Sequence, residues 1–277
     1  AYPDKMFRWG YFPETVHYTE EEWEQLKPAD GILRIVWAGR FIPLKHAEMM
    51  PRLAAFLREH LEEIRKEGIT DADSLTPVRD GLYIWQGDIT TLRCDAIVNA
   101  ANGGMTGCYV PNHRCIDNMI HSKSGIALRL CCADLMKKQG HEEPAGRAKI
   151  TPAFNLPCRY ILHTVGPIIY DRVRKEDERL LASCYRSCLE LADENGIRSI
   201  AFCCISTGEF HFPNELAAEI AVRTVKEYRN GKTGIEKVIF NVFKDIDKEI
   251  YERLLGAGRR CPVLPKAGAA PVAQAGF

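Results

Sequence analysis

Hydrophobic residues follow two alternating spacings along residues 76–256, and each spacing predicts a different element. Short apolar runs predict strands at 82–86, 96–99, 148–154, 160–165, 199–205 and 238–243. Apolar positions three and four residues apart predict helices at 116–121, 125–138, 176–194, 213–228 and 246–255. Because strands and helices alternate, we expect an α/β fold with a largely parallel sheet covered by helices on both faces.

The same pattern divides the chain into three parts. Residues 1–75 predict a mainly helical N-terminal extension, with one helix beginning near Thr19 and another over Leu53–Ile64. Residues 76–256 form the main domain. Residues 257–277 are rich in Ala, Gly and Pro and contain no acidic residue, so we expect a disordered tail.

Composition restricts the classes of partner. The 277 residues contain 37 Lys plus Arg and 37 Asp plus Glu, and this zero net charge argues against nucleic-acid binding. No apolar run is long enough to span a bilayer, so we expect no membrane association. The eleven cysteines are odd in number and several lie in apolar runs, which favours an intracellular, reducing compartment, the cytoplasm. We expect a monomer.

Four polar loops follow predicted strands, at the edge where open α/β sheets bind ligands. They are 87–90, 99–107, 206–213 and 241–245. Each loop alone is compatible with a simple turn or helix cap. Four such loops at one edge of the sheet favour a ligand site.

Cys108, His113 and Cys115 lie within eight residues and offer two thiolates and one imidazole to a metal ion. Three protein ligands with an open position are typical of catalytic zinc. If Cys94 or Cys158 supplied a fourth ligand, the site would be closed and structural. The remaining alternative is two buried cysteines beside a surface histidine.

The loop sequences resemble a known family. Gly87-Asp-Ile-Thr90, Asn99-Ala-Ala-Asn102, Ser206-Thr-Gly208 with Phe210-His-Phe-Pro213, and Asn241-Val-Phe243 are similar to those of the macrodomain, an ADP-ribose-binding module. The resemblance covers roughly residues 80–256 and implies a three-layer α/β/α fold with a mixed, largely parallel sheet. The cysteine–histidine–cysteine insert resembles the zinc-dependent subclass of macrodomain ADP-ribosyl hydrolases.

This resemblance implies a role for each loop. Asp88 and Ile89 would hold adenine, with Phe243 stacked on the ring. Asn102 would hold the distal ribose, with Phe212 nearby, and Asp117 would position or activate water; these two polar residues are the catalytic candidates. The remaining substrate-binding residues would be Asn99, Gly107, Ser206, Thr207, Gly208, Glu209, Phe210 and Asn241. Zinc would be held by Cys108, His113 and Cys115, and would either polarise the ADP-ribose–protein bond or activate a bound water.

The implied activity is zinc-dependent removal of mono-ADP-ribose from modified protein side chains, with ADP-ribose and mono-ADP-ribosylated proteins as partners. The alternatives are an ADP-ribose reader with a structural zinc and an O-acetyl-ADP-ribose deacetylase. Two residues depart from a simple phosphate loop. His211 occupies a position that is often glycine, and the charge of Glu209 would be unfavourable beside a diphosphate unless its side chain points away.

Overall fold

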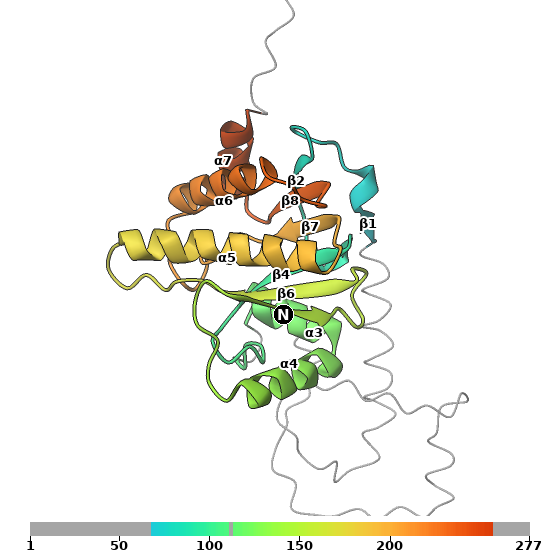
Figure 1. The fold of residues 1–277 in the computed structure, drawn as a ribbon, viewed down its shortest axis with the longest axis vertical. Coiled ribbons are helices and arrows are strands. Elements are labelled where there is room, and N and C mark those ends of the chain that lie inside the picture. The colour runs from blue at the N-terminus through green and yellow to red at the C-terminus, as the bar shows by residue number, and fades with distance from the viewer. Residues whose placement is uncertain (1–67, 111–112, 257–277) are drawn as a thin grey trace, which may run out of the picture.

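The structure, a computed structural model, describes residues 68–110 and 113–256 (Figure 1). The strands of the main sheet are β2 (Leu82–Gln86), β4 (Ala96–Ala101), β5 (Ala148–Pro152), β6 (Tyr160–Val165), β7 (Ser199–Phe202) and β8 (Lys237–Val242). The helices are α3 (Ile116–Ser124), α4 (Ile126–Gln139), α5 (Lys175–Glu194), α6 (Asn214–Arg229) and α7 (Asp245–Leu255). Two short strands, β1 (Thr70–Asp71) and β3 (Leu92–Arg93), pair in parallel beside the main sheet.

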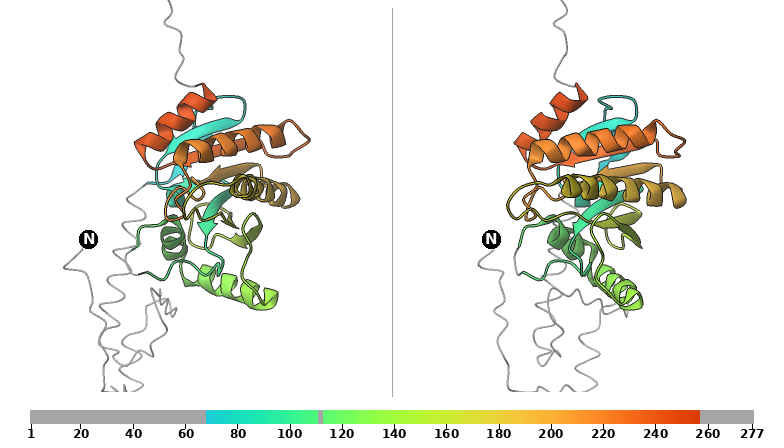
Figure 2. Two further views of the ribbon diagram at one scale, coloured as in Figure 1. Left: turned by 90° about the vertical axis from the view of Figure 1, so that its left-hand side faces the viewer. Right: turned by 60° about the vertical axis from the view of Figure 1, so that its left-hand side comes forward.

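The main sheet has the order β2-β8-β7-β4-β6-β5. All neighbouring strands are parallel except β5, which runs antiparallel to β6 at one edge. Helix α6 packs against both α5 and α7, whereas α3 packs on α4 and β4 (Figures 1 and 2). The expected α/β fold with a mixed, largely parallel sheet is therefore confirmed.

The side chains at the centre of the sheet are fully buried. Ile97 and Val98 of β4 and Ile200 of β7 have no exposed surface. In the helical layer that covers this part of the sheet, the ring of Tyr185 on α5 contacts the ring of Phe202 on β7, and the two ring centroids are 5.0 Å apart. Such two-sided burial explains why these strands are almost continuously apolar in sequence.

Each strand and helix predicted within residues 76–256 is present, and the differences lie at the ends. The strand predicted through Ile205 ends at Phe202, because the chain then turns, with the Thr207 N–H donating to the Cys204 carbonyl at 3.4 Å. The strand predicted through Phe154 ends at Pro152, and Phe154 has a left-handed φ of 54°.

Most predictions for the two ends of the chain concern residues outside the described ranges. The helices expected near Thr19 and over Leu53–Ile64 and the expected disordered tail at 257–277 all lie beyond them. The described end of the predicted extension contains β1 and a short 3-10 helix, Ala72–Ser74. Within the described ranges, no helix has both the length and the apolar character needed to cross a membrane.

Replacing Ile97 by Ala should lower the free energy of unfolding by about 2–5 kcal/mol, because it leaves a cavity in the middle of the sheet. Ile246→Ala is the matched control: Ile246 is 57% exposed, and its loss should change stability by no more than about 0.5 kcal/mol. Urea denaturation measures both values. Equal effects of the two substitutions would contradict the placement of Ile97 in the core.

Candidate functional site

The candidate site lies where β4 and β7 run side by side. These neighbouring parallel strands, paired at Ile97 and Ala201, are followed by loops that lead into α3 and α6 respectively. Helix α3 packs with α4 while α6 packs with α5 and α7, so the two loops leave the same carboxyl edge of the sheet towards different helices. This is the position at which open α/β sheets form a ligand crevice.

A buried carboxylate links the end of β4 to the first turn of α3. Asp117 Oδ1 accepts a hydrogen bond from Asn99 Nδ2 at 2.9 Å, and Oδ2 accepts one from Asn102 Nδ2 at 3.1 Å. Asn102 Oδ1 in turn accepts from the Gly104 N–H at 3.0 Å. Both predicted catalytic residues are therefore in contact, and the Asn102 amide is fixed from both ends.

Burial has the largest effect on the pKa of Asp117. It raises the pKa of this carboxyl to about 6, although the hydrogen bond from Asn99 and the charge of Arg129 act in the opposite direction. A carboxyl in such a position binds a proton more readily than an exposed one.

His121 and His163 lie on predicted apolar elements, and this position in the sequence favours core residues with hydrogen-bond partners. Both histidines lie beneath this network. His163 meets the expectation: Nδ1 is 3.1 Å from Asn99 Nδ2, and Nε2 is 3.0 Å from Thr151 Oγ1. His121 is equally buried, but neither ring nitrogen has a hydrogen-bond partner among the described residues. Its closest charged neighbour is Asp117, with 3.5 Å between Nε2 and Oδ1. The prediction for His121 is therefore correct for burial and wrong for hydrogen bonding.

The Asn102 loop passes directly over His121. Gly107 has a φ of 85°, and a Cβ on it would lie 2.7 Å from the His121 ring. Glycine is therefore required here by both backbone conformation and space. The Gly107 carbonyl accepts a hydrogen bond from Asn102 Nδ2 at 3.3 Å, which places this predicted substrate-binding residue next to the amide.

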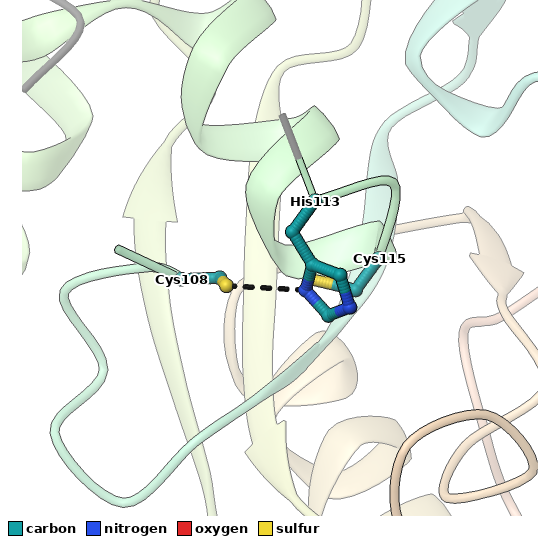
Figure 3. A group of neighbouring side chains, drawn as sticks. All are labelled: Cys108, His113 and Cys115. Atoms are coloured by element: carbon teal, nitrogen blue, oxygen red, sulfur yellow. Dashed lines mark hydrogen bonds between the residues drawn. The ribbon is translucent and has the colours of Figure 1, made fainter. Parts of the chain in front are cut away.

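The three predicted metal ligands converge (Figure 3). The Sγ atom of Cys108, a ring nitrogen of His113 and the Sγ atom of Cys115 all lie within 4.8 Å of one another. The Sγ–Nδ1 distance between Cys108 and His113 is 3.3 Å. A tetrahedral zinc ion, about 2.3 Å from sulfur and about 2.0 Å from nitrogen, would hold such atoms roughly 3.5 Å apart. The donor set and its spacing fit zinc.

The loop carrying these ligands is held by its own side chains. Cys115 is the N-cap of α3, and its sulfur accepts from the Asn118 N–H at 3.4 Å. Asn118 Nδ2 donates to the carbonyls of Cys108 and Val110 at 3.4 and 3.2 Å. Helix α3 therefore positions two of the three ligands.

The expected fourth-ligand candidates do not approach the group. Among the described residues, neither Cys94 nor Cys158 belongs to it, and Cys94 Sγ instead donates to the Ala96 carbonyl at 3.2 Å. The two ligand thiols differ: burial raises the pKa of Cys115 to about 11. For Cys108 burial is outweighed by hydrogen bonds, first from the Val110 backbone and then from His113, and its pKa is lowered.

The loop after β7 has a strained backbone. Ser206 and His211 adopt left-handed φ values of 64° and 55°, which are costly for residues other than glycine and concentrate at functional sites. Glycine would adopt the φ of His211 without this cost. Phe212 N–H donates to the Ser206 carbonyl at 2.9 Å and closes the loop.

Three backbone N–H groups of this loop are available as hydrogen-bond donors. Among the described residues, the N–H groups of Gly208, Glu209 and Phe210 take no part in the loop's backbone hydrogen bonds. The buried Ser206 Oγ also has no hydrogen-bond partner in the described ranges. Successive backbone N–H groups without acceptors in the described residues are suited to an anion.

The residues predicted for adenine lie at the β2 and β8 end. Asp88 Oδ1 accepts from the Thr90 N–H at 2.9 Å, and Oδ2 accepts from Lys123 Nζ at 2.8 Å, while Ile89 is buried. Asn241 Nδ2 donates to the Gly87 carbonyl at 2.9 Å and so braces this loop. Phe243 is 75% exposed, as a stacking ring needs to be.

Two further predicted site residues, Phe212 and Thr207, contact other parts of the chain. Phe212, expected near the distal ribose, is 1% exposed within the core, and Thr207 Oγ1 donates to the Cys204 carbonyl at 3.0 Å.

Three features of the site escaped sequence analysis. Gly166 follows β6 at the same edge, and a Cβ on it would lie 2.0 Å from Ser206 Oγ; the Gly-Pro pair after an apolar strand was an available signal. The Lys123–Asp88 contact and the approach of Glu209 Oε1 to His113 Nε2, at 3.3 Å, link distant parts of the chain and have no local signal.

With this geometry in view, comparison with known proteins identifies the family. The family pattern described as "Macro domain" matches residues 98–221. A protein-ADP-ribose hydrolase from Treponema medium is 57% identical over 198 residues, which cover 70% of this chain and 76% of that protein. The chain belongs to the Macro domain family. A protein-ADP-ribose hydrolase from Staphylococcus aureus strain MSSA476 is 52% identical over 194 residues, covering 69% of this macrodomain chain and 73% of the relative.

Solved macrodomains share the fold. The Oceanobacillus iheyensis macrodomain with ADP has a TM-score of 0.59 and 36% sequence identity, over 66% of this chain and 94% of that one. The Trypanosoma brucei macrodomain in complex with ADP-ribose has a TM-score of 0.58 and 32% identity, over 68% and 75% of the two chains.

The buried His163 should make stability depend on pH. Burial lowers its pKa from 6.5 to about 3, so below pH 6.5 the unfolded chain binds a proton that the folded chain excludes. Stability is therefore complete above pH 6.5 and should fall by about 1.4 kcal/mol for each pH unit below it, down to about pH 3.

Urea denaturation at pH 7.5 and 5.5, in one chelating buffer, measures this contribution. The wild type should lose about 1.4 kcal/mol more between the two pH values than His163→Gln, whose amide can still bond to Asn99 and Thr151. An identical loss in both proteins would contradict a neutral, buried His163.

Proposed function

We propose that this protein is a zinc-dependent hydrolase that removes mono-ADP-ribose from modified protein side chains. The observation that carries the proposal is the convergence of Cys108, His113 and Cys115 on the loop that also contains Asn102. Relatives named protein-ADP-ribose hydrolase, at 57% and 52% identity, support the reaction. The related macrodomain structures titled with ADP and ADP-ribose support the ligand.

The residues of the chain divide the binding of ADP-ribose among three loops. The unpaired backbone donors at 208–210 suit the diphosphate, since a glycine on one side lets the backbone approach closely. Asp88, Ile89 and the exposed Phe243 would receive adenine at the β2 and β8 end. This arrangement directs the distal ribose towards Asn102.

Asn102 would hold the distal ribose hydroxyls beside the bond to be broken. Its amide cannot rotate freely, because Asp117 and Gly104 bind opposite ends of it. Positioning of this kind lowers a reaction barrier by fixing the reacting atoms before the reaction begins. The role of Asp117 towards water stays a prediction.

Zinc would be held by Cys108, His113 and Cys115. When bound there, it would supply a Lewis acid next to the substrate, able to polarise an oxygen atom. The three-ligand group, without Cys94 or Cys158, leaves a coordination position available for such an oxygen.

Replacing one of the predicted cysteine ligands tests whether the protein binds zinc at this group. Protein purified without added zinc should contain about one zinc ion per chain, as measured by plasma emission, and Cys115→Ser should contain almost none. Cys131→Ser, which changes a half-buried cysteine on α4 outside the group, is the matched control and should retain the ion.

Release of ADP-ribose from a mono-ADP-ribosylated protein should fall by at least about 100-fold in Cys115→Ser and remain unchanged in Cys131→Ser. Full activity in the zinc-free variant would exclude the proposed role of the metal. Binding of ADP-ribose without any release by the wild type would instead indicate a binding module.

Replacing Asn102 by Ala tests the positioning role. We expect kcat to fall by about 100-fold because the ribose loses its fixed orientation. Zinc content should change little, since the metal ligands are not altered. The Kd for ADP-ribose, measured by calorimetry, should rise by much less than kcat falls, since the 206–210 loop and the adenine-binding residues are intact. An unchanged kcat would show that Asn102 does not position the substrate.

A further inference from the structure

Glu209 and His113 come from two separate loops and contact each other. His113 lies between β4 and α3, and Glu209 lies between β7 and α6, 96 residues further along the chain. Glu209 Oε1 is 3.3 Å from His113 Nε2. The two loops can meet because β4 and β7 are adjacent, parallel strands.

The two nitrogens of the His113 ring face different neighbours. Nδ1 lies 3.3 Å from the Cys108 sulfur, while Nε2 faces Glu209. Figure 3 shows Nδ1 directed at Cys108. Glu209 is not one of the ligand atoms that converge within 4.8 Å, so it stands outside the metal group and behind the imidazole. A carboxylate that accepts the second N–H of a ligating histidine fixes the tautomer and the direction of the ring.

The backbone holds Glu209 in this position. The Phe212 N–H donates to the Ser206 carbonyl at 2.9 Å, and the His211 N–H donates to the Gly208 carbonyl at 3.0 Å. The Phe210 carbonyl accepts from the Ile169 N–H at 2.9 Å. Because the loop is braced on both sides of Glu209, the position of this carboxylate depends on the shape of the loop that we assign to the diphosphate.

We propose that Glu209 is a positioning residue that orients His113 for the metal and thereby couples metal binding to ADP-ribose binding. This inference rests on the proposed function of the two loops. It also explains why an acidic residue is tolerated in a diphosphate loop, since its side chain points to the imidazole of the neighbouring loop. By linkage, zinc and ADP-ribose should strengthen each other's binding by the same factor.

Zinc affinity, measured by competition with a chromophoric chelator, tests the orienting role. Glu209→Ala should bind zinc about 10–100-fold more weakly than the wild type. Glu209→Gln should recover much of the loss, because its amide oxygen can still accept from Nε2. Glu219→Ala, at an exposed position on α6, is the matched control and should bind zinc as the wild type does.

The thermal stability of the metal-free protein separates orientation from a structural role. The side chains of Glu209 and His113 are 66% and 29% exposed, so their ion pair contributes little to folding. The metal-free Glu209→Ala protein should therefore unfold at the same temperature as the wild type. A lowered unfolding temperature together with an unchanged zinc affinity would overturn the inference.

Calorimetry of ADP-ribose binding, with and without zinc, tests the coupling. In the wild type, zinc should raise the affinity for ADP-ribose by about 5–150-fold, and in Glu209→Ala this ratio should approach one. Equal ratios in both proteins would overturn the coupling and leave the proposed hydrolase unaffected. A wild type that shows the coupling but releases no ADP-ribose would remove the proposed activity and leave the role of Glu209 intact.

Discussion

The carboxylate of Asp117 is the constraint on which the site depends. One oxygen binds Asn99 within β4 and the other binds Asn102 just after it, while Asp117 itself belongs to the first turn of α3. The loop between β4 and α3 is therefore closed at its base by a single buried group. A buried carboxylate without partners would be costly, so the two amides and the acid require one another. The three predicted metal ligands belong to the segment that this closure defines.

The parallel sheet determines what this loop can meet. The adjacency of β4 and β7 brings together the carboxyl ends of two strands that are about a hundred residues apart in sequence. The loop of the predicted metal ligands and the loop at 206–212 therefore lie side by side, in contact through His113 and Glu209. Under the proposed function, zinc on one loop and backbone donors on the other would together suit a ligand that carries both phosphate and a polarisable oxygen. The left-handed backbone at Ser206 and His211 shows that this arrangement is kept at a local conformational cost.

Sequence analysis was most successful where the signal is local. Hydrophobic periodicity predicted each strand of the main sheet and each helix that covers it. The predicted ligands Cys108, His113 and Cys115 could be grouped from sequence because they lie within eight residues, and the structure brings their donor atoms within 4.8 Å of one another. Contacts set by strand register were not accessible. The Glu209–His113 and Lys123–Asp88 pairs join segments that become neighbours only after the sheet forms. Likewise, the close passage of Gly107 over the His121 ring is set by the fold, and no spacing rule reveals it.

The compactness of the ligand set in sequence has a practical consequence. An ion held by Cys108, His113 and Cys115 closes only a short segment of chain, whereas the six-stranded sheet derives its stability from apolar burial elsewhere. Under the proposed function, the segment would therefore lose and regain its ion while the rest of the molecule remains folded. Preparations of identical circular dichroism and solubility would then differ in metal content, and a folded, inert sample would be no measure of what the protein can do.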